Sequence, residues 1–179
     1  MNKIIELVTQ DTLRVSALQC AAKLDLPDWY LAAGFVRNLV WDQLHALPEP
    51  TPLNDVDMIY FDPSEKDDEI YLTYEQQLTE MMPELNWQVR NQAKMHLRNG
   101  DRAYTSSLDA MSYWPEKETA VGIRLNQGQD YQCVAAFGYQ SLFELKVTHN
   151  PKRGKSVFDQ RVATKGWLQR WPKLTLASD

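Results

Sequence analysis

Two aspartates separated by a single residue stand inside an apolar segment of the chain. Asp55 and Asp57 flank Val56, and the mainly apolar residues 58–61 follow directly. Because successive side chains of a strand alternate between its two faces, both carboxylates are expected to point the same way. Neighbouring carboxylates repel each other, and the pKa of one rises unless a cation neutralises them. The pair therefore predicts a divalent metal site. The alternative is an edge strand or a turn with two solvated aspartates.

A glycine upstream predicts a second part of the same site. Gly34 joins an apolar stretch, 29–33, to an amphipathic one, 35–45. The free N–H groups and the dipole at a helix N-terminus attract phosphate, and glycine lets the backbone approach it closely. Mg²⁺ prefers one or two carboxylates together with phosphate oxygens of a substrate. The combination predicts Mg²⁺-dependent transfer of a nucleotidyl group from a nucleoside triphosphate, with Asp55 and Asp57 as metal ligands and catalytic residues.

Residues at the start of the predicted helix are candidates for nucleotide binding. Gly34 and the backbone amide of Phe35 are expected to hold the β- and γ-phosphates. Arg37 and Asn38 follow about one helical turn later. Arg37 either grips a phosphate or pairs with an acid, and the sequence favours neither alternative.

The remaining pattern predicts the elements that position these residues. Periodicity and turn residues predict helices at 11–24, 35–45, 64–81, 91–97, 141–145 and 157–171, and strands at 29–33, 53–61, 86–90, 119–125 and 131–136. A stiff proline-rich loop spans 47–52, and 126–130 is expected to close a hairpin. The prediction is one α+β domain over residues 1–179, a small mixed sheet flanked by helices.

Composition limits the class of protein. Of 179 residues, 44% are hydrophobic and only 7 are Gly and 9 Pro, which is typical of an ordered globular chain. The sequence contains no run of about 18 apolar residues and no N-terminal apolar region, so we expect neither a membrane span nor a signal peptide. Cys20 and Cys133 lack metal-binding spacing and are expected to be buried thiols in a reducing cytoplasm.

Charge is distributed unevenly along the chain. Residues 1–145 hold 11 Lys and Arg against 22 Asp and Glu, whereas residues 146–173 hold 8 basic residues and one acid. This basic segment either receives phosphates or forms a solvated helix face. With an overall net charge of −5, an extended nucleic-acid track is not indicated. By elimination, the acceptor is expected to be a small molecule or a protein.

Two stretches carry a resemblance to a known superfamily. Ala33-Gly-Phe-Val-Arg-Asn38 and Asn54-Asp-Val-Asp-Met-Ile59 resemble the head of DNA polymerase β-type nucleotidyltransferases, closest to the Gly-Gly-x-Val-Arg-Asp and Asp-x-Asp pattern of poly(A) polymerases and CCA-adding enzymes. The chain as a whole resembles a bacterial family of stand-alone nucleotidyltransferase-like proteins, and further matching stretches lie at 91–96, 109–115, 119–122 and 165–172. The resemblance implies the nucleotidyltransferase fold, a nucleoside triphosphate donor and Mg²⁺.

The chain departs from the superfamily pattern at two points. Gly34-Phe35 stands where Gly-Gly or Gly-Ser is usual, and the Phe35 side chain is expected to crowd the phosphate approach. A third carboxylate is expected on a following strand, where 86–90 offers Gln88 as a neutral catalytic candidate that orients a water or ligand. Asp109 would take that role if the strand assignment were wrong.

These departures keep other interpretations open. One is a catalytically weakened protein of the same fold that acts as a nucleotide-binding or regulatory module. Another is an interaction protein outside the superfamily with an incidental Asp-x-Asp strand. Asn91 and Gln92, polar residues at the end of the 86–90 strand, either bind a base or sugar or cap the next helix.

Overall fold

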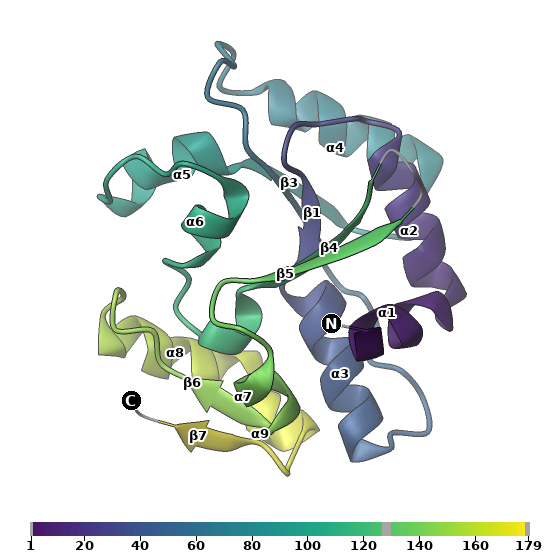
Figure 1. Cartoon of the computed structure of the whole chain (residues 1–179), viewed down its shortest axis with the longest axis vertical. Helices are drawn as coiled ribbons and strands as arrows, with labels where there is room; N and C mark the ends of the chain where they lie inside the picture. Colours follow the sequence, from purple (N-terminus) through teal and green to yellow (C-terminus); the bar gives the residue numbers. More distant parts are fainter. Residues whose placement is uncertain (1, 127–129, 178–179) are drawn as a thin grey trace.

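A five-stranded mixed sheet forms the centre of the molecule (Figure 1). The computed structural model describes residues 2–126 and 130–177. The strand order is β3-β2-β1-β4-β5, in which β2 and β3 are parallel and the other neighbours antiparallel. The strands are β1 (Tyr30–Ala32), β2 (Val56–Tyr60), β3 (Trp87–Asn91), β4 (Val121–Leu125) and β5 (Tyr131–Ala135).

Helices lie on both sides of this sheet. In Figure 1, α1, α2 and α4 lie to one side, and α5 and α6 to the other. The helices are α1 (Asn2–Thr9), α2 (Thr12–Ala22), α3 (Gly34–His45), α4 (Ile70–Met81), α5 (Gln92–Asn99), α6 (Ser107–Met111), η1 (Lys117–Thr119), α7 (Gln140–Phe143), α8 (Lys155–Lys165) and α9 (Trp167–Arg170). A second, parallel pair joins β6 (Lys146–Thr148) to β7 (Thr175–Ala177). The predicted α+β architecture, a small mixed sheet flanked by helices, is confirmed.

Alternation along β2 places the main core and Asp57 on opposite faces of the sheet. Val56, Met58 and Tyr60 are fully buried in the main core. Asp57 and Ile59 point to the opposite face, because strand side chains alternate. The main core thus covers one face of the sheet, and the other face carries a smaller apolar cluster that includes Ile59, with Asp57 beside it.

An unusual turn links β1 to α3. Ala33 has φ +55° and ψ −120°, a left-handed region that favours glycine. Its amide donates to the carbonyl of Val121 at 3.0 Å, and its own carbonyl accepts from the amides of Val36 and Arg37 at 3.2 and 2.9 Å. These hydrogen bonds fix the start of α3 against the central strands.

The predicted closing helix at 157–171 is wrong. Gly166 has φ +64° and divides it into α8 and α9. This break redirects the chain so that residues from both helices reach one pocket.

Other boundaries also differ from the expectation. The helix predicted from 64 begins at Ile70, because the side chains of Asp62 and Asp67 accept hydrogen bonds from the amides of Ser64 and Glu69 in turns instead. The strand predicted from 119 begins at Val121, since 117–119 form η1. The periodicity did not predict α1, β6 or β7. The predicted hairpin joins β4 and β5, but its tip at 127–129 lies outside the described residues.

The expectations about membrane spans and about the two cysteines can be compared with the described residues. Within 2–126 and 130–177, no helix is long and apolar enough to cross a membrane. Cys133 is buried and Cys20 half-buried, both as free thiols. Burial raises the pKa of the Cys133 thiol to about 11.

Candidate active site

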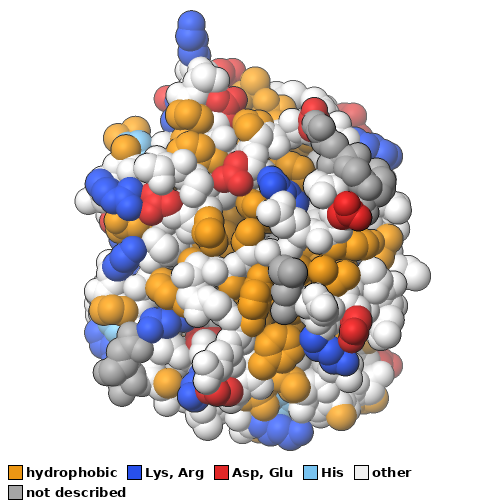
Figure 2. All heavy atoms as spheres, viewed as in Figure 1, with side chains coloured by type: hydrophobic (Ala, Val, Ile, Leu, Met, Phe, Trp, Pro, Cys, Tyr) orange, Lys and Arg blue, Asp and Glu red, His pale blue; other side chains and the backbone are white. Residues whose placement is uncertain are grey.

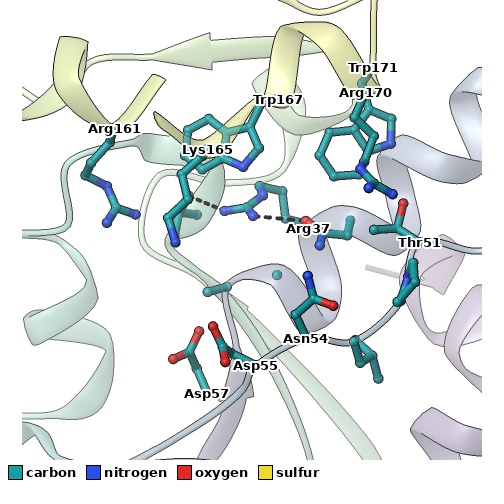
Figure 3. A pocket seen from close by; sticks show the side chains of 16 residues that line it. Arg37, Thr51, Asn54, Asp55, Asp57, Arg161, Lys165, Trp167, Arg170 and Trp171 are labelled. Atoms are coloured by element: carbon teal, nitrogen blue, oxygen red, sulfur yellow. Dashed lines mark hydrogen bonds between the residues drawn. The ribbon is translucent and has the colours of Figure 1, made fainter. Parts of the chain in front are cut away.

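The two aspartates lie side by side at the N-terminal end of β2 (Figure 3). Asp57 pairs in register with Ala32 of β1 and Gln88 of β3. Burial, and then the neighbouring carboxylate of Asp55, raise the pKa of Asp57. Asn86 Nδ2 donates to Asp55 Oδ1 at 2.6 Å and helps to hold that side chain in place. The raised pKa indicates an electrostatic cost that a bound cation would relieve.

The donor set at this position fits Mg²⁺. Over the part of the chain that the structure describes, no three or more His, Cys, Asp or Glu side chains gather into a metal-binding group. Mg²⁺ needs no such cage, because it usually takes one or two carboxylates and completes its shell with water and substrate phosphate oxygens. Asp55 and Asp57 are the residues that would hold it.

One pocket of about 240 Å³ opens between this pair and the start of α3. We call it the α3 pocket. Figure 3 shows that its walls come from β2, α3, the loop before β2 and the C-terminal helices. The residues lining it are Ala33, Gly34, Arg37, Asn38, Thr51, Pro52, Leu53, Asn54, Asp55, Asp57, Thr119, Arg161, Lys165, Trp167, Arg170 and Trp171.

The N-terminus of α3 presents its backbone to this pocket. The amides of Gly34 and Phe35 precede the first hydrogen bonds of the helix, which the Ala33 carbonyl accepts from Val36 and Arg37. A Cβ atom at position 34 would lie 3.3 Å from Asn38 Nδ2, so glycine keeps the approach open. The helix end has the form of an anion-binding site.

The Phe35 side chain does not crowd this approach. It is fully buried in the main core, and the guanidinium of Arg14 lies 5.6 Å from its ring centroid. Arg14 Nε also donates to the Phe35 carbonyl at 2.9 Å. The residue in a glycine-like conformation is Ala33, one position before Gly34. The expectation of a steric block by Phe35 was therefore wrong.

Arg37 is buried at the back of the α3 pocket with its charge retained. Its Nη1 donates to Thr119 Oγ1 at 2.7 Å and its Nη2 to Asn38 Oδ1 at 2.9 Å. The guanidinium carbon lies 5.0 and 4.6 Å from the ring centroids of Trp41 and Trp167. Burial lowers its pKa to about 10, so it stays cationic at neutral pH. Its Nε has no hydrogen-bond partner among the described residues.

Three more cations enter the pocket from the C-terminal segment: Arg161 and Lys165 of α8, and Arg170 of α9. Lys165 extends toward the aspartate pair in Figure 3. The Nε of Arg161 forms an ion pair with Glu116 at 2.5 Å. Sequence reasoning did not identify these three as site residues. The signals present in the sequence were the basic excess of residues 146–173 and, for Lys165 and Arg170, the family resemblance over 165–172.

Two buried acids, Asp42 and Glu118, hold α9 and β6 in place beside the α3 pocket. Asp42 of α3 accepts hydrogen bonds from the Thr51 amide at 2.7 Å, the Thr51 hydroxyl at 2.6 Å and Trp171 Nε1 at 2.8 Å. Glu118 accepts from the amide and hydroxyl of Thr148, both at 2.7 Å. These contacts fasten α9 and β6 to the elements that form the α3 pocket.

A second pocket of about 330 Å³ meets the aspartate pair from the β3 side. We call it the β3 pocket. It shares Ala33, Asp55, Asp57, Thr119, Arg161 and Lys165 with the α3 pocket, and adds Ile59, Gln88, Arg90, Gln92, Met95, Trp114 and Pro115. The aspartates therefore stand where two separate cavities meet.

Other polar candidates have structural roles. Asp109 forms two hydrogen bonds of 2.8 Å with Arg102 and lines neither pocket, so it does not replace a third carboxylate. Asn91 caps α5 by accepting from the Ala93 amide at 3.0 Å. Gln92, by contrast, lines the β3 pocket.

Comparison with known proteins decides the family. A family model described as nucleotidyltransferase matches residues 19–176. The chain belongs to this nucleotidyltransferase family. The chain is also similar to a protein whose NMR structure reveals a CCA-adding enzyme head domain. The identity is 31% and the TM-score 0.86, over 100% of this chain and 96% of that one. No curated protein sequence matches.

More distant structures share the fold alone. A complex of a CCA-adding enzyme with CTP matches the chain with 14% identity and a TM-score of 0.60, over 97% of this chain and 42% of that one. A tRNA-processing enzyme complex matches with 14% identity and a TM-score of 0.52, over 90% and 43%. Matches to the present chain thus cover less than half of each of these longer chains.

Proposed function

We propose that the protein transfers a nucleoside monophosphate from a Mg²⁺-bound nucleoside triphosphate to a hydroxyl group. The observation that carries the proposal is the meeting of three features at one pocket: the aspartate pair, the open N-terminus of α3 and four cationic side chains. Each feature alone is common. Together they supply the metal ligands and the anion site that nucleotidyl transfer needs.

The charge of the α3 pocket supports this substrate. Its lining carries four cations and two carboxylates, a formal excess of two positive charges. A triphosphate with one Mg²⁺ keeps about two negative charges, so the excess is complementary to it. Glu116 offsets part of the charge of Arg161 from behind. Lys165 and Arg170 have no ion-pair partner among the described residues and are free to meet a phosphate.

We assign a role to each group of residues. The amides of Gly34 and Phe35 bind phosphate oxygens at the positive end of the helix dipole. Arg37, held rigidly by Thr119 and Asn38, binds the β- or γ-phosphate. Asn38 positions that guanidinium and adds a polar edge to the pocket.

The reaction exchanges one bond to the α-phosphorus for another. The acceptor oxygen bonds to the α-phosphorus, the bond from that phosphorus to the bridging oxygen breaks, pyrophosphate leaves and the hydroxyl proton passes to solvent. When bound, Mg²⁺ would activate the acceptor oxygen and offset charge on the transferring group. Asp55 and Asp57 hold the cation, while Lys165 and Arg161 stabilise the charge that develops on the leaving pyrophosphate.

Gln88 favours a second candidate function. It stands beside Asp57 in the position expected for a third carboxylate, and an amide adds no negative charge for the metal. A protein so altered would bind the Mg²⁺ triphosphate in the α3 pocket without turnover and act as a nucleotide-binding or regulatory module.

Calorimetry with each nucleoside triphosphate, with and without Mg²⁺, tests the proposal. We expect Mg²⁺-dependent binding that is lost when Asp55→Asn and Asp57→Asn are combined. The pair Glu80→Gln and Glu84→Gln, two exposed acids of and just after α4, removes the same formal charge away from both pockets and serves as the control.

The outcomes separate the candidates. Binding that does not need Mg²⁺, or that survives the double aspartate substitution, overturns the metal-dependent site. Binding without pyrophosphate release, across proteins, small alcohols and RNA ends as acceptors, identifies the module instead of the enzyme.

A further inference from the structure

The β3 pocket approaches the aspartate pair from a different direction than the α3 pocket. The two cavities share Asp55, Asp57, Arg161 and Lys165, but only the α3 pocket contains the helix N-terminus, Arg37 and Arg170. The α3 pocket therefore supplies more of the charged contacts for a triphosphate than the β3 pocket does. A second substrate has to reach the same metal ligands, and the β3 pocket is a cavity through which it can do so.

The β3 pocket's own side chains are almost free of uncompensated charge. Arg90, its additional cation, pairs with Glu75 at 2.5 Å and lies 4.7 Å from the ring centroid of Tyr71. The rest of the additional lining is apolar, aromatic or amide: Ile59, Gln88, Gln92, Met95, Trp114 and Pro115. Such a surface binds an uncharged group better than a phosphate.

Two glutamines present complementary hydrogen-bonding atoms. Gln88 Oε1 accepts from Arg90 Nη2 at 3.2 Å, and Gln92 Nε2 donates to the Arg90 carbonyl at 3.3 Å. Among the described residues, neither Gln88 Nε2 nor Gln92 Oε1 has a partner. One donor and one acceptor thus remain beside the half-buried indole of Trp114. A planar ring that carries both an acceptor and a donor on one edge satisfies both amides and can lie against the indole.

We infer that the β3 pocket is the acceptor site and takes an uncharged, hydroxyl-bearing molecule of nucleoside size. The inference rests on the proposed function. A volume of about 330 Å³ suits such a molecule. In the reaction, the bound molecule's hydroxyl oxygen replaces the bridging oxygen on the α-phosphorus, pyrophosphate leaves through the α3 pocket and the proton passes to solvent.

The charge of the elements around the β3 pocket does not favour a polymeric acceptor. On the face of the molecule shown in Figure 2, blue and red side chains are interspersed among orange apolar ones. Residues 1–145, which supply all of the pocket's additional lining, hold twice as many acids as bases. A nucleic-acid backbone gains its affinity from basic groups that are free to pair with phosphates. The three cations that line this pocket already face acids: Arg90 pairs with Glu75, Arg161 with Glu116, and Lys165 acts on Asp57.

Ligand-detected NMR with the four common ribonucleosides tests the inference. The protein is first saturated with Mg²⁺ and a non-hydrolysable triphosphate, whose own binding is measured separately by calorimetry. We expect saturable binding of at least one nucleoside, weakened about fivefold by Gln92→Met, the effect of losing one neutral hydrogen bond. Gln77→Met, an exposed glutamine of α4 outside both pockets, is the matched control and should leave binding unchanged.

The results decide between the possible sources of failure. Triphosphate binding without any nucleoside binding overturns the acceptor site but leaves the proposed function standing. Nucleoside binding that Gln92→Met does not weaken also overturns it, because the ligand then lies elsewhere. A single-stranded oligonucleotide that binds at least tenfold tighter than its terminal nucleoside would assign a polymer instead. If calorimetry detects no Mg²⁺-dependent triphosphate binding to the unsubstituted protein, the proposed function itself is refuted.

Discussion

Asp57 and Gln88 are direct neighbours across the parallel strands β2 and β3. Their side chains share the face of the sheet that carries the site, so the amide lies where it can support the aspartate pair or a ligand beside it. Arg90 fixes the Gln88 oxygen. The pairing makes position 88 the natural place at which to alter metal binding without disturbing the core.

Gln88→Glu would introduce a third carboxylate next to Asp57. We expect affinity for a divalent cation to rise about tenfold, because a further anionic oxygen ligand is added at short range. Titration with Mn²⁺ followed by electron paramagnetic resonance would measure the change. Gln88→Leu, which removes the amide without adding charge, should leave the affinity within about twofold. Equal affinity in all three proteins would place the metal away from β3.

Asp57→Asn should stabilise the metal-free protein in a pH-dependent way. The pKa of Asp57 is raised by burial and by Asp55, so ionisation destabilises the folded state. The cost is absent below the unfolded pKa of about 4 and complete above the higher folded pKa. We expect the Tm to rise by about 2–4 °C at neutral pH and the gain to disappear near pH 4. Thermal melts across pH in chelator provide the measurement, and a gain independent of pH would contradict the assignment.

Lys165→Ala should weaken triphosphate binding roughly tenfold, the effect expected for one charge-assisted contact. Lys165 reaches into the α3 pocket, whereas Lys66 is exposed away from both pockets. Lys66→Ala therefore removes the same formal charge without the contact and should have little effect. Calorimetry at two salt concentrations would also show a smaller difference at high salt, because screening weakens an accessible charge. Equal losses of triphosphate affinity in Lys165→Ala and Lys66→Ala would show that the effect comes from the net charge of the protein and not from a contact between Lys165 and the phosphate.

Ala33→Gly should raise the free energy of unfolding by up to about 1.5 kcal/mol. The left-handed conformation of Ala33 costs about 1–2 kcal/mol, which glycine avoids at an entropic cost of about 0.5–1 kcal/mol. Urea denaturation would measure the gain. Ala17→Gly, in the interior of α2, should instead destabilise the protein by about 1 kcal/mol. A loss of stability in Ala33→Gly would show that the turn carries no strain.

Local patterns were sufficient to predict the centre of the sheet and half of the α3 pocket. The alternation around Asp55 and Asp57 and the glycine before α3 are short-range signals, and they predicted β2, α3 and their adjacency. Gln88 was placed beside the pair because β3 follows from the alternating apolar residues Trp87 and Val89.

The C-terminal cations of the α3 pocket, Arg161, Lys165 and Arg170, could not be predicted from such local patterns. Arg161 and Lys165 of α8 line the pocket with the aspartates. Arg170 joins them after the break at Gly166, where Asp42 accepts a hydrogen bond from Trp171, 129 positions away. Such long-range contacts leave no periodic trace in the sequence. The burial of Phe35 was misjudged for a related reason, since which face of α3 enters the core depends on its packing.

The anchoring of Trp171 by Asp42 has a consequence for protein synthesis. A nascent chain that ends before Arg161 would already contain both aspartates and the start of α3. It would lack Arg161, Lys165 and Arg170, the C-terminal cations that line the α3 pocket. Under the proposed function, triphosphate binding has to await the emergence of α8 and α9 from the ribosome, and products that end before Arg161 are expected to bind a triphosphate weakly even when their sheet has formed.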